Sequence, residues 1–170
     1  FGCYENGVLV SVVSFGTACF NPNHSKIGKY AFEHNMRVIQ LNRGGTRYDA
    51  PRNTASAAVA LALKKVRELF GDTVIVAYSD TKWNEIGTIY QSTNFMYFGL
   101  TEPKGQSNYI INGRKLSGWT VRKKYGTRDM GKLSLMFDDV VRVPLTPKHL
   151  YVYVNSSAFN KKRAFKFFEE

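Results

Sequence analysis

Two stretches near the middle of the chain specify the centre of the fold: Val74-Ile75-Val76-Ala77-Tyr78-Ser79-Asp80 and Gly87-Thr88-Ile89-Tyr90-Gln91-Ser92-Thr93-Asn94-Phe95. The first is an uninterrupted apolar run ending at an aspartate, a pattern typical of a central strand covered on both faces. The second predicts a short helix around residues 86–93, and the run 95–100 predicts another strand. Asp80 and Tyr90 therefore lie where strands are followed by a loop and a helix, where α/β proteins keep their sites.

The residues before this centre predict three strands and a long helix. Residues 1–4 and 8–15 flank Asn6-Gly7, a dipeptide typical of a tight hairpin turn. Residues 21–35 are polar and predict a loop, and residues 36–42 predict the third strand. A basic, glycine-bearing loop is expected over residues 43–52, followed by a helix over 55–70 that Asn53 or Thr54 caps.

The residues after the centre are more polar. Residues 103–118 predict a hairpin that turns at Asn112-Gly113, residues 150–154 predict a last strand, and residues 161–170 form a charged tail. A length of 170 residues favours one domain. We expect an α/β (α+β) fold with a mixed, largely antiparallel central sheet flanked by helices. Because Phe1 is predicted to lie in the middle of a strand, we also expect a segment to precede it.

The charge of the chain indicates its partner. Lysine and arginine number 24 against 13 acidic residues, which gives a formal net charge of +11. An excess of this size favours a polyanion, with nucleic acid first. The strongest concentration is residues 114–128, where cations surround Trp119 and Tyr125. The candidate DNA-contacting residues are Arg43, Arg47, Trp83, Arg114, Trp119, Arg122, Lys123, Lys124, Tyr125 and Arg128.

Other classes of site are not indicated. Cys3 and Cys19 have no metal-ligand spacing and provide no disulfide framework. The three histidines, His24, His34 and His149, lie in polar surroundings and are expected at the surface. We expect no metal site. No apolar run reaches the roughly 18 residues of a membrane-spanning helix, so we expect no membrane partner.

The central run resembles the phage Mom family, which modifies adenine in DNA and is built on the acetyltransferase fold called GNAT. Family members resemble (S/A)-(Y/F)-(A/S)-D…G-H-x-G-x-I-Y-Q-A-x-N-(F/W)-x-Y-x-G. Tyr78-Ser79-Asp80, residues 87–91 and residues 94–99 of this chain are similar to that pattern. Glu85 stands where family members have a histidine, and an upstream His-Tyr motif would precede Phe1. The order of three strands, long helix, strand, short helix and strand fits the core of a GNAT domain.

The resemblance implies a donor site before the long helix. GNAT proteins bind the pyrophosphate of coenzyme A at a helix start with the motif (Q/R)-x-x-G-x-(G/A). The similar residues here are Arg52, Asn53, Thr54, Ala55, Ser56 and Ala57, with Ala55 in place of the first glycine. An ordinary capped helix explains Asn53 and Thr54 equally well. Asn94 is a further candidate for contact with the cofactor, which is acetyl-coenzyme A or another activated acyl donor.

The resemblance also implies three catalytic residues. Asp80 is expected to act as a general base or to orient the attacked amine, although an aspartate after a strand is also a common cap. Tyr90 is expected to protonate the departing thiolate, because a tyrosine on this helix often does so in GNAT proteins. Glu85 joins them because it replaces the family histidine.

The function implied is transfer of an acyl-type group to the exocyclic amine of adenine in double-stranded DNA, within the cytoplasm of a bacterial host, as a protection against restriction. The base must leave the stack for this chemistry, at a cost of a few kcal/mol. Two alternatives remain. One is a GNAT enzyme that acylates a small amine or a protein, and the other is a non-catalytic basic DNA-binding protein on a degenerate GNAT frame.

Overall fold

The structure is a computed structural model of the chain that describes residues 1–18, 25–101, 107–157 and 167. Within these residues, contacts divide the chain into two compact units. The larger unit comprises residues 1–79, 85–99 and 149–170, and the smaller unit comprises residues 80–84 and 100–148. A single domain stays a prediction. The tail expected over residues 161–170 lies outside the described residues except for Phe167.

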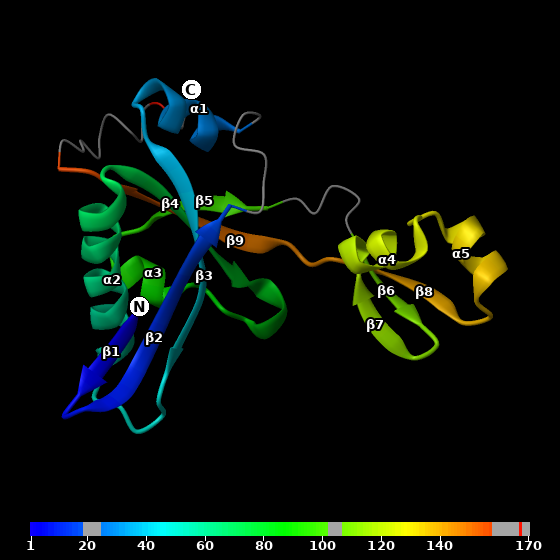
Figure 1. Cartoon of the computed structure of the whole chain (residues 1–170), viewed down its shortest axis with the longest axis horizontal. Helices are drawn as coiled ribbons and strands as arrows, with labels where there is room; N and C mark the ends of the chain where they lie inside the picture. Colours follow the sequence, from blue (N-terminus) through cyan, green and yellow to red (C-terminus); the bar gives the residue numbers. More distant parts are fainter. Residues whose placement is uncertain (19–24, 102–106, 158–166, 168–170) are drawn as a thin grey trace. The chain divides into compact units, whose positions relative to one another are not determined.

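The larger unit is built on a six-stranded sheet (Figure 1) with the strand order β1-β2-β3-β4-β9-β5. Its strands are β1 (Gly2–Glu5), β2 (Val8–Thr17), β3 (Arg37–Thr46), β4 (Thr73–Asp80), β5 (Met96–Leu100) and β9 (Lys148–Asn155). β2 pairs antiparallel with β1 and β3, while β3 and β4 are parallel. The expectation of a mixed, largely antiparallel sheet flanked by helices is confirmed.

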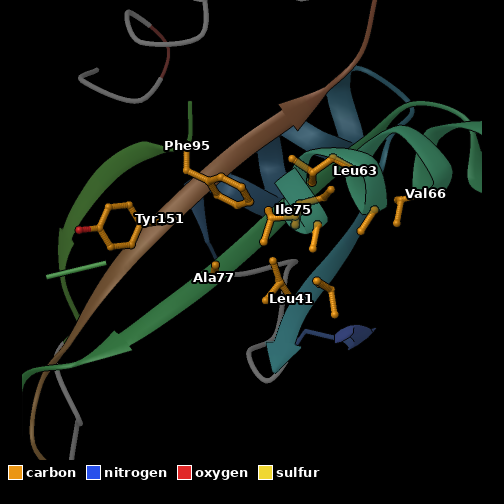
Figure 2. Close-up of a cluster of buried hydrophobic side chains, with 11 residues drawn as sticks. Leu41, Leu63, Val66, Ile75, Ala77, Phe95 and Tyr151 are labelled. Atoms are coloured by element: carbon orange, nitrogen blue, oxygen red, sulfur yellow. The ribbon is translucent and has the colours of Figure 1, made fainter. Parts of the chain in front are cut away.

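β4 lies between two hydrophobic cores because its side chains alternate between the faces of the sheet. Ile75 and Ala77 join the core beneath α2 (Thr54–Phe70), whereas Val74 and Val76 join the core beneath α1 (Lys26–Glu33). Figure 2 shows the first core, where Leu41, Leu63, Val66, Phe95 and Tyr151 gather around Ile75 and Ala77. The short helix α3 (Thr88–Ser92) packs against this same core through Ile89 and Tyr90.

Two local predictions for the larger unit are wrong, and a third, the cap of the long helix, is correct in position but not in its hydrogen bond. Within the loop expected over 21–35, residues 26–33 form α1, which Ser25 caps and which buries an apolar stripe of Ile27, Tyr30 and Ala31. In the loop expected over 43–52, Arg43–Thr46 extend β3, because Gly44 and Gly45 pair with β2. Asn53 is the N-cap of α2 in a left-handed conformation, with φ of 69°, and its side chain makes no capping hydrogen bond.

The smaller unit has its own three-stranded sheet, ordered β7-β6-β8. Its elements after the short 3-10 helix η2 (Thr81–Trp83) are β6 (Ser107–Ile111), β7 (Arg114–Ser117), α4 (Gly118–Tyr125), α5 (Met130–Met136) and β8 (Val140–Pro144). The predicted turn at Asn112-Gly113 joins β6 to β7 and is confirmed. Tyr109, Ile111, Val121 and Leu133 form its core.

No helix among the described residues is long and apolar enough to cross a membrane. In the same residues, no group of three or more histidine, cysteine or acidic side chains could hold a metal ion.

Candidate functional site

A cavity of about 300 Å³ lies in the larger unit, lined by residues of β2, β3, the start of α2 and α3, among them Leu41, Ala55 and Tyr90. β3 pairs with β4 from Arg37 to Gln40, and beyond that stretch it stays paired with β2 as far as Thr46. The cavity lies beside this carboxyl-terminal part of β3, and the carboxyl ends of strands are a common place for ligands in sheets of this kind.

The first turn of α2 borders this cavity. Within the described residues, the backbone N–H groups of Ala55 and Ser56 donate to no acceptor, and the Asn53 side chain does not cap them. The hydroxyls of Thr54 and Ser56 donate to the carbonyl oxygens of Pro51 and Asn53 instead. Free N–H groups at a helix start, together with the positive end of its dipole, suit an anion such as phosphate.

A second, larger groove of about 900 Å³ lies on the other side of this turn, between α2, the end of α3 and β9. It brings together four of the predicted cofactor-contacting residues, which are Asn53, Ser56, Ala57 and Asn94. Arg52 and Thr54 do not line it, and Ala55 lines the smaller cavity. The start of α2 therefore contributes residues to two openings, a larger groove and a smaller cavity that Tyr90 also lines.

Tyr90 is half-buried on α3. Its ring packs on Phe95 and Tyr151, with ring centroids 5.5 and 5.3 Å apart, and its hydroxyl donates to the Tyr78 carbonyl oxygen at 3.4 Å. Burial raises the pKa of Tyr90 above its ordinary value, and the charge of Glu85 and the neighbouring Tyr151 raise it further. Tyr90 therefore keeps its proton to a higher pH than an exposed tyrosine does.

Hydrogen bonds from one residue of β9 and one residue of α3 fix the loop that carries Glu85. The Tyr151 hydroxyl and the Gln91 amide both donate to the Ile86 carbonyl oxygen, at 2.5 and 2.7 Å. The Gln91 amide also reaches the Tyr151 hydroxyl at 3.3 Å. Glu85 itself is exposed. Gln91 thus has a structural task in the described residues, which is to hold this loop against β9.

Asp80 belongs to the smaller unit and caps η2. Its Oδ1 atom accepts hydrogen bonds from the Lys82 backbone N–H at 3.0 Å and from the Thr146 hydroxyl at 3.2 Å. These are the contacts of a loop-fixing aspartate, the alternative that the sequence already left open. Its catalytic role stays a prediction.

The smaller unit carries most of the predicted DNA-contacting cations. α4 has Ser117 as its cap and exposes Trp119, which is 70% accessible with the Lys123 ammonium 5.1 Å from its ring centroid. Tyr125 is half-buried against Phe137 and belongs to the core of the unit. The exposed cations on β7, α4 and the turn after it are Arg114, Lys115, Arg122, Lys123, Lys124 and Arg128.

The remaining predicted contacts are dispersed. Arg43 is exposed on β3, and Arg52 is exposed just before α2. Arg47 is exposed but makes a two-pronged ion pair with Asp49 at 2.6 and 2.8 Å. Trp83, in the smaller unit, is 69% accessible and lies beneath the Lys82 ammonium.

One pair of side chains was missed by sequence reasoning. The Tyr97 hydroxyl and the His149 Nδ1 atom are 3.1 Å apart, and Tyr97 also packs on Tyr151 with ring centroids 5.4 Å apart. Their separation in sequence gives no local signal, since it is the neighbouring positions of β5 and β9 in the sheet that bring them together. His149 is half-buried rather than a free surface histidine.

Comparison with known proteins supports the resemblance in the central run. The chain is 33% identical over 103 residues to the methylcarbamoylase mom of Escherichia phage Mu, a match covering 59% of this chain and 42% of the relative. The chain thus spans less than half the length of that curated relative. The model of the Mom protein family matches residues 1–168, almost the whole sequence. The chain therefore belongs to the Mom protein family.

Proposed function

We propose that this chain is a phage DNA-modification protein that transfers an acyl-type group to the exocyclic amine of adenine. The relative from phage Mu bears the name methylcarbamoylase, and a methylcarbamoyl group is one such acyl-type group. The chain would act on double-stranded DNA in the cytoplasm of the bacterial host. A base modified in this way would protect the DNA from host restriction enzymes.

The single observation that carries the proposal is the first turn of α2, whose N–H groups the Asn53 side chain does not cap, beside the cavity that Ala55 and Tyr90 line. In this proposal the N–H groups of Ala55 and Ser56, which donate to no acceptor among the described residues, would bind a pyrophosphate. The groove lined by Asn53, Ser56, Ala57 and Asn94 would hold the remainder of a nucleotide-bearing donor. A coenzyme A thioester is the donor class of the GNAT fold that this family resembles. When bound, it would supply an activated carbonyl carbon.

Three residues of the chain have proposed roles in the proton transfers. Tyr90, which is protonated at neutral pH as tyrosines are, donates its proton to the leaving group. Asp80 takes a proton from the amine or orients it, and Glu85 adds negative charge beside Tyr90. This charge raises the pKa of Tyr90 further.

The basic face of the smaller unit supports DNA as the substrate. Its exposed cations have no salt-bridge partner among the described residues, so they are available for phosphates. Trp119 offers an exposed ring for an unstacked base, a contact worth about 1–3 kcal/mol. Arg43, Arg47, Arg52 and Trp83 extend the candidate surface.

Nucleoside mass spectrometry on plasmid DNA from cells that express the chain tests the proposal. We expect a modified adenosine whose added mass identifies the acyl-type group, and none in cells with an empty vector. A plasmid that carries the modification should also resist cleavage by restriction enzymes with adenine in their sites. Unmodified DNA from cells that contain folded protein would contradict the proposal.

A non-catalytic DNA-binding protein is the second candidate, and one observation favours it. The hydrogen bonds that Lys82 and Thr146 donate to Asp80 Oδ1 come from its own unit and are structural. Calorimetry with coenzyme A separates the candidates, because a binding-only protein has no need of a donor and would release no heat. The same titration followed by mass analysis of DNA distinguishes an enzyme for DNA from an enzyme for small amines.

A further inference from the structure

Tyr97 and His149 form a hydrogen-bonded pair on neighbouring strands of the large sheet. The Tyr97 hydroxyl oxygen lies 3.1 Å from His149 Nδ1, and the two rings meet with centroids 5.6 Å apart at 52°. Tyr97 is 51% accessible and His149 is half-buried. A substrate can therefore reach the pair from solvent, while the imidazole is held on one side by its partner.

This pair is continuous with the ring of Tyr90. Tyr97 packs on Tyr151 with centroids 5.4 Å apart, and Tyr151 packs on Tyr90 with centroids 5.3 Å apart. Tyr151 also fixes the loop behind Glu85 through the Ile86 carbonyl oxygen. All these residues belong to the larger unit. One aromatic cluster thus holds a proton-donating tyrosine at one end and an imidazole at the other.

The second described histidine has a different environment. His34 Nδ1 lies 2.8 Å from the backbone carbonyl oxygen of Tyr30, and its ring stacks on Tyr30 at 4.2 Å between centroids. It lies at the end of α1, beside the other core. Among the described residues, His149 is therefore the histidine oriented by an ionisable side chain, which is the arrangement of a base held by a third group.

We propose that His149 accepts the proton that the attacking amine loses, and that Tyr97 positions it. In this arrangement Nδ1–H donates to the Tyr97 hydroxyl oxygen, so that the Nε2 lone pair is free. The inference rests on the proposed function and assigns its acceptor-side base. The residues of this proton transfer, Tyr90, Tyr97 and His149, all belong to the larger unit.

The step balances with an acyl thioester as donor. The adenine amine nitrogen attacks the carbonyl carbon, a carbon–nitrogen bond forms, and the carbon–sulfur bond breaks with its electron pair on sulfur. Tyr90 gives its proton to that sulfur, and His149 Nε2 takes the proton from nitrogen. Solvent then takes the proton from His149 and returns one to Tyr90, so no net charge remains on the protein.

Three variants test the assignment in cells that supply the donor: His149→Gln, Tyr97→Phe and His34→Gln. With adenine modification measured by nucleoside mass spectrometry, His149→Gln should lose about 10²- to 10⁴-fold, the usual contribution of a general base. Tyr97→Phe keeps the ring and removes only the hydroxyl, so it should lose less. His34→Gln is the matched control and should modify DNA as the wild type does. Melting temperatures should agree among all four proteins.

A second measurement depends on neither donor nor DNA. Nitrogen-15 NMR of labelled histidine should show His149 with its proton on Nδ1 in the wild type, and Tyr97→Phe should shift the proton toward Nε2. A wild-type proton fixed on Nε2 overturns the assignment, because that nitrogen then has no lone pair to offer. His149→Gln with full modification overturns it as well. Wild-type protein that leaves DNA unmodified overturns the proposed function itself.

Discussion

Gly87 lies against the ring of Tyr151. A Cβ atom at residue 87 would fall 2.7 Å from Tyr151 Cζ, closer than side-chain carbons approach, and the Gly87 φ of 63° is itself in the left-handed region. The Tyr151 hydroxyl beyond that contact fixes the Ile86 carbonyl oxygen. Gly87 is thus required by the packing of Tyr151 of β9 against this loop, whether or not a ligand binds.

Gly87→Ala should therefore lower the free energy of unfolding of the larger unit by more than the left-handed backbone conformation alone would. The left-handed conformation costs an alanine about 1–2 kcal/mol, and the collision with Tyr151 adds about 1–3 kcal/mol of overpacking. Gly7→Ala is the matched control, since Gly7 also has a positive φ, 79°, but no atom lies within 4 Å of its added Cβ. Urea unfolding of both variants measures the difference, and equal losses would contradict the collision.

The raised pKa of Tyr90 predicts a loss of stability in alkali. The folded protein holds the proton more tightly than the unfolded chain, whose tyrosines titrate near pH 10. The stabilising contribution is therefore complete below about pH 10 and is lost as the pH rises through the folded pKa of Tyr90. Tyr90→Phe should show a shallower alkaline decline in the free energy of unfolding than the wild type.

Glu85→Gln tests, by the same unfolding measurement, whether the charge of Glu85 contributes to the raised pKa of Tyr90. Removing the negative charge should lower the pKa of Tyr90 toward its ordinary value, so the alkaline decline should again be shallower. Tyr48→Phe removes a hydroxyl from a fully exposed side chain and serves as the control. A Glu85→Gln protein with the wild-type decline would show that the charge of Glu85 does not contribute measurably to the raised pKa of Tyr90.

The strands that frame the site were predictable, but the way they meet was not. The apolar run 73–78, the Asn-Gly turns and the helix over 55–70 carry local signals, and all appear in the structure. Gly44 and Gly45 indicated a loop because glycine is depleted in strands, yet here β2 pairs with them. The apolar residues Ile27, Tyr30 and Ala31 of α1 were present in the sequence, but the polar residues around them indicated a loop.

The candidate site was only partly predictable for a related reason. Asn53, Ser56, Ala57 and Asn94, which the sequence indicated as candidates for contact with a cofactor, line one groove. The pairing of Tyr97 with His149 depends on β9 inserting beside β5, a contact between residues 52 apart in sequence. Sequence periodicity reports which face a residue occupies but carries no information on which strand is its neighbour.

Asp80→Asn separates the chemical from the structural role of this residue. An asparagine can still accept the hydrogen bond from the Lys82 backbone N–H, so the cap and the melting temperature should be retained. The loss of charge should reduce adenine modification by orders of magnitude if the carboxylate contacts the amine. Asp80→Ala, which also removes the cap, should lower the free energy of unfolding by about 1 kcal/mol. Full modification by Asp80→Asn would leave Asp80 as a cap alone.

Ala55→Asp should abolish binding of coenzyme A without harming the fold. A carboxylate in the first turn suits the helix dipole in the free protein, but it occupies the position and repels the charge of a pyrophosphate. Leu61→Asp is the control, because it adds the same charge to the same helix at an exposed residue outside both cavities. Isothermal calorimetry measures the affinity of each protein for coenzyme A. Equal affinity in Ala55→Asp and wild type would show that the donor does not bind at the start of α2.

The basic face of α4 predicts how DNA binding depends on salt. Changing Arg122, Lys123 and Lys124 to alanine together should weaken binding to every DNA sequence alike, because phosphate contacts position a protein without reading bases. The slope of log affinity against log salt should become shallower by about 0.9 for each phosphate that the variant no longer neutralises. Fluorescence anisotropy with a labelled duplex at stepped salt concentrations measures this slope.

The control for the α4 variant removes three cations from the larger unit, Lys26, Lys29 and Lys65, of which Lys29 and Lys65 are paired with glutamates. Both variants lower the net charge of the chain by the same amount, so a difference between their slopes reports the place of the charges rather than their number. We expect the control to keep a slope close to that of the wild type. An unchanged slope in the α4 variant would indicate that DNA binds elsewhere. The next candidates are Arg43, Arg47 and Arg52, which are exposed on β3 and in the segment before α2.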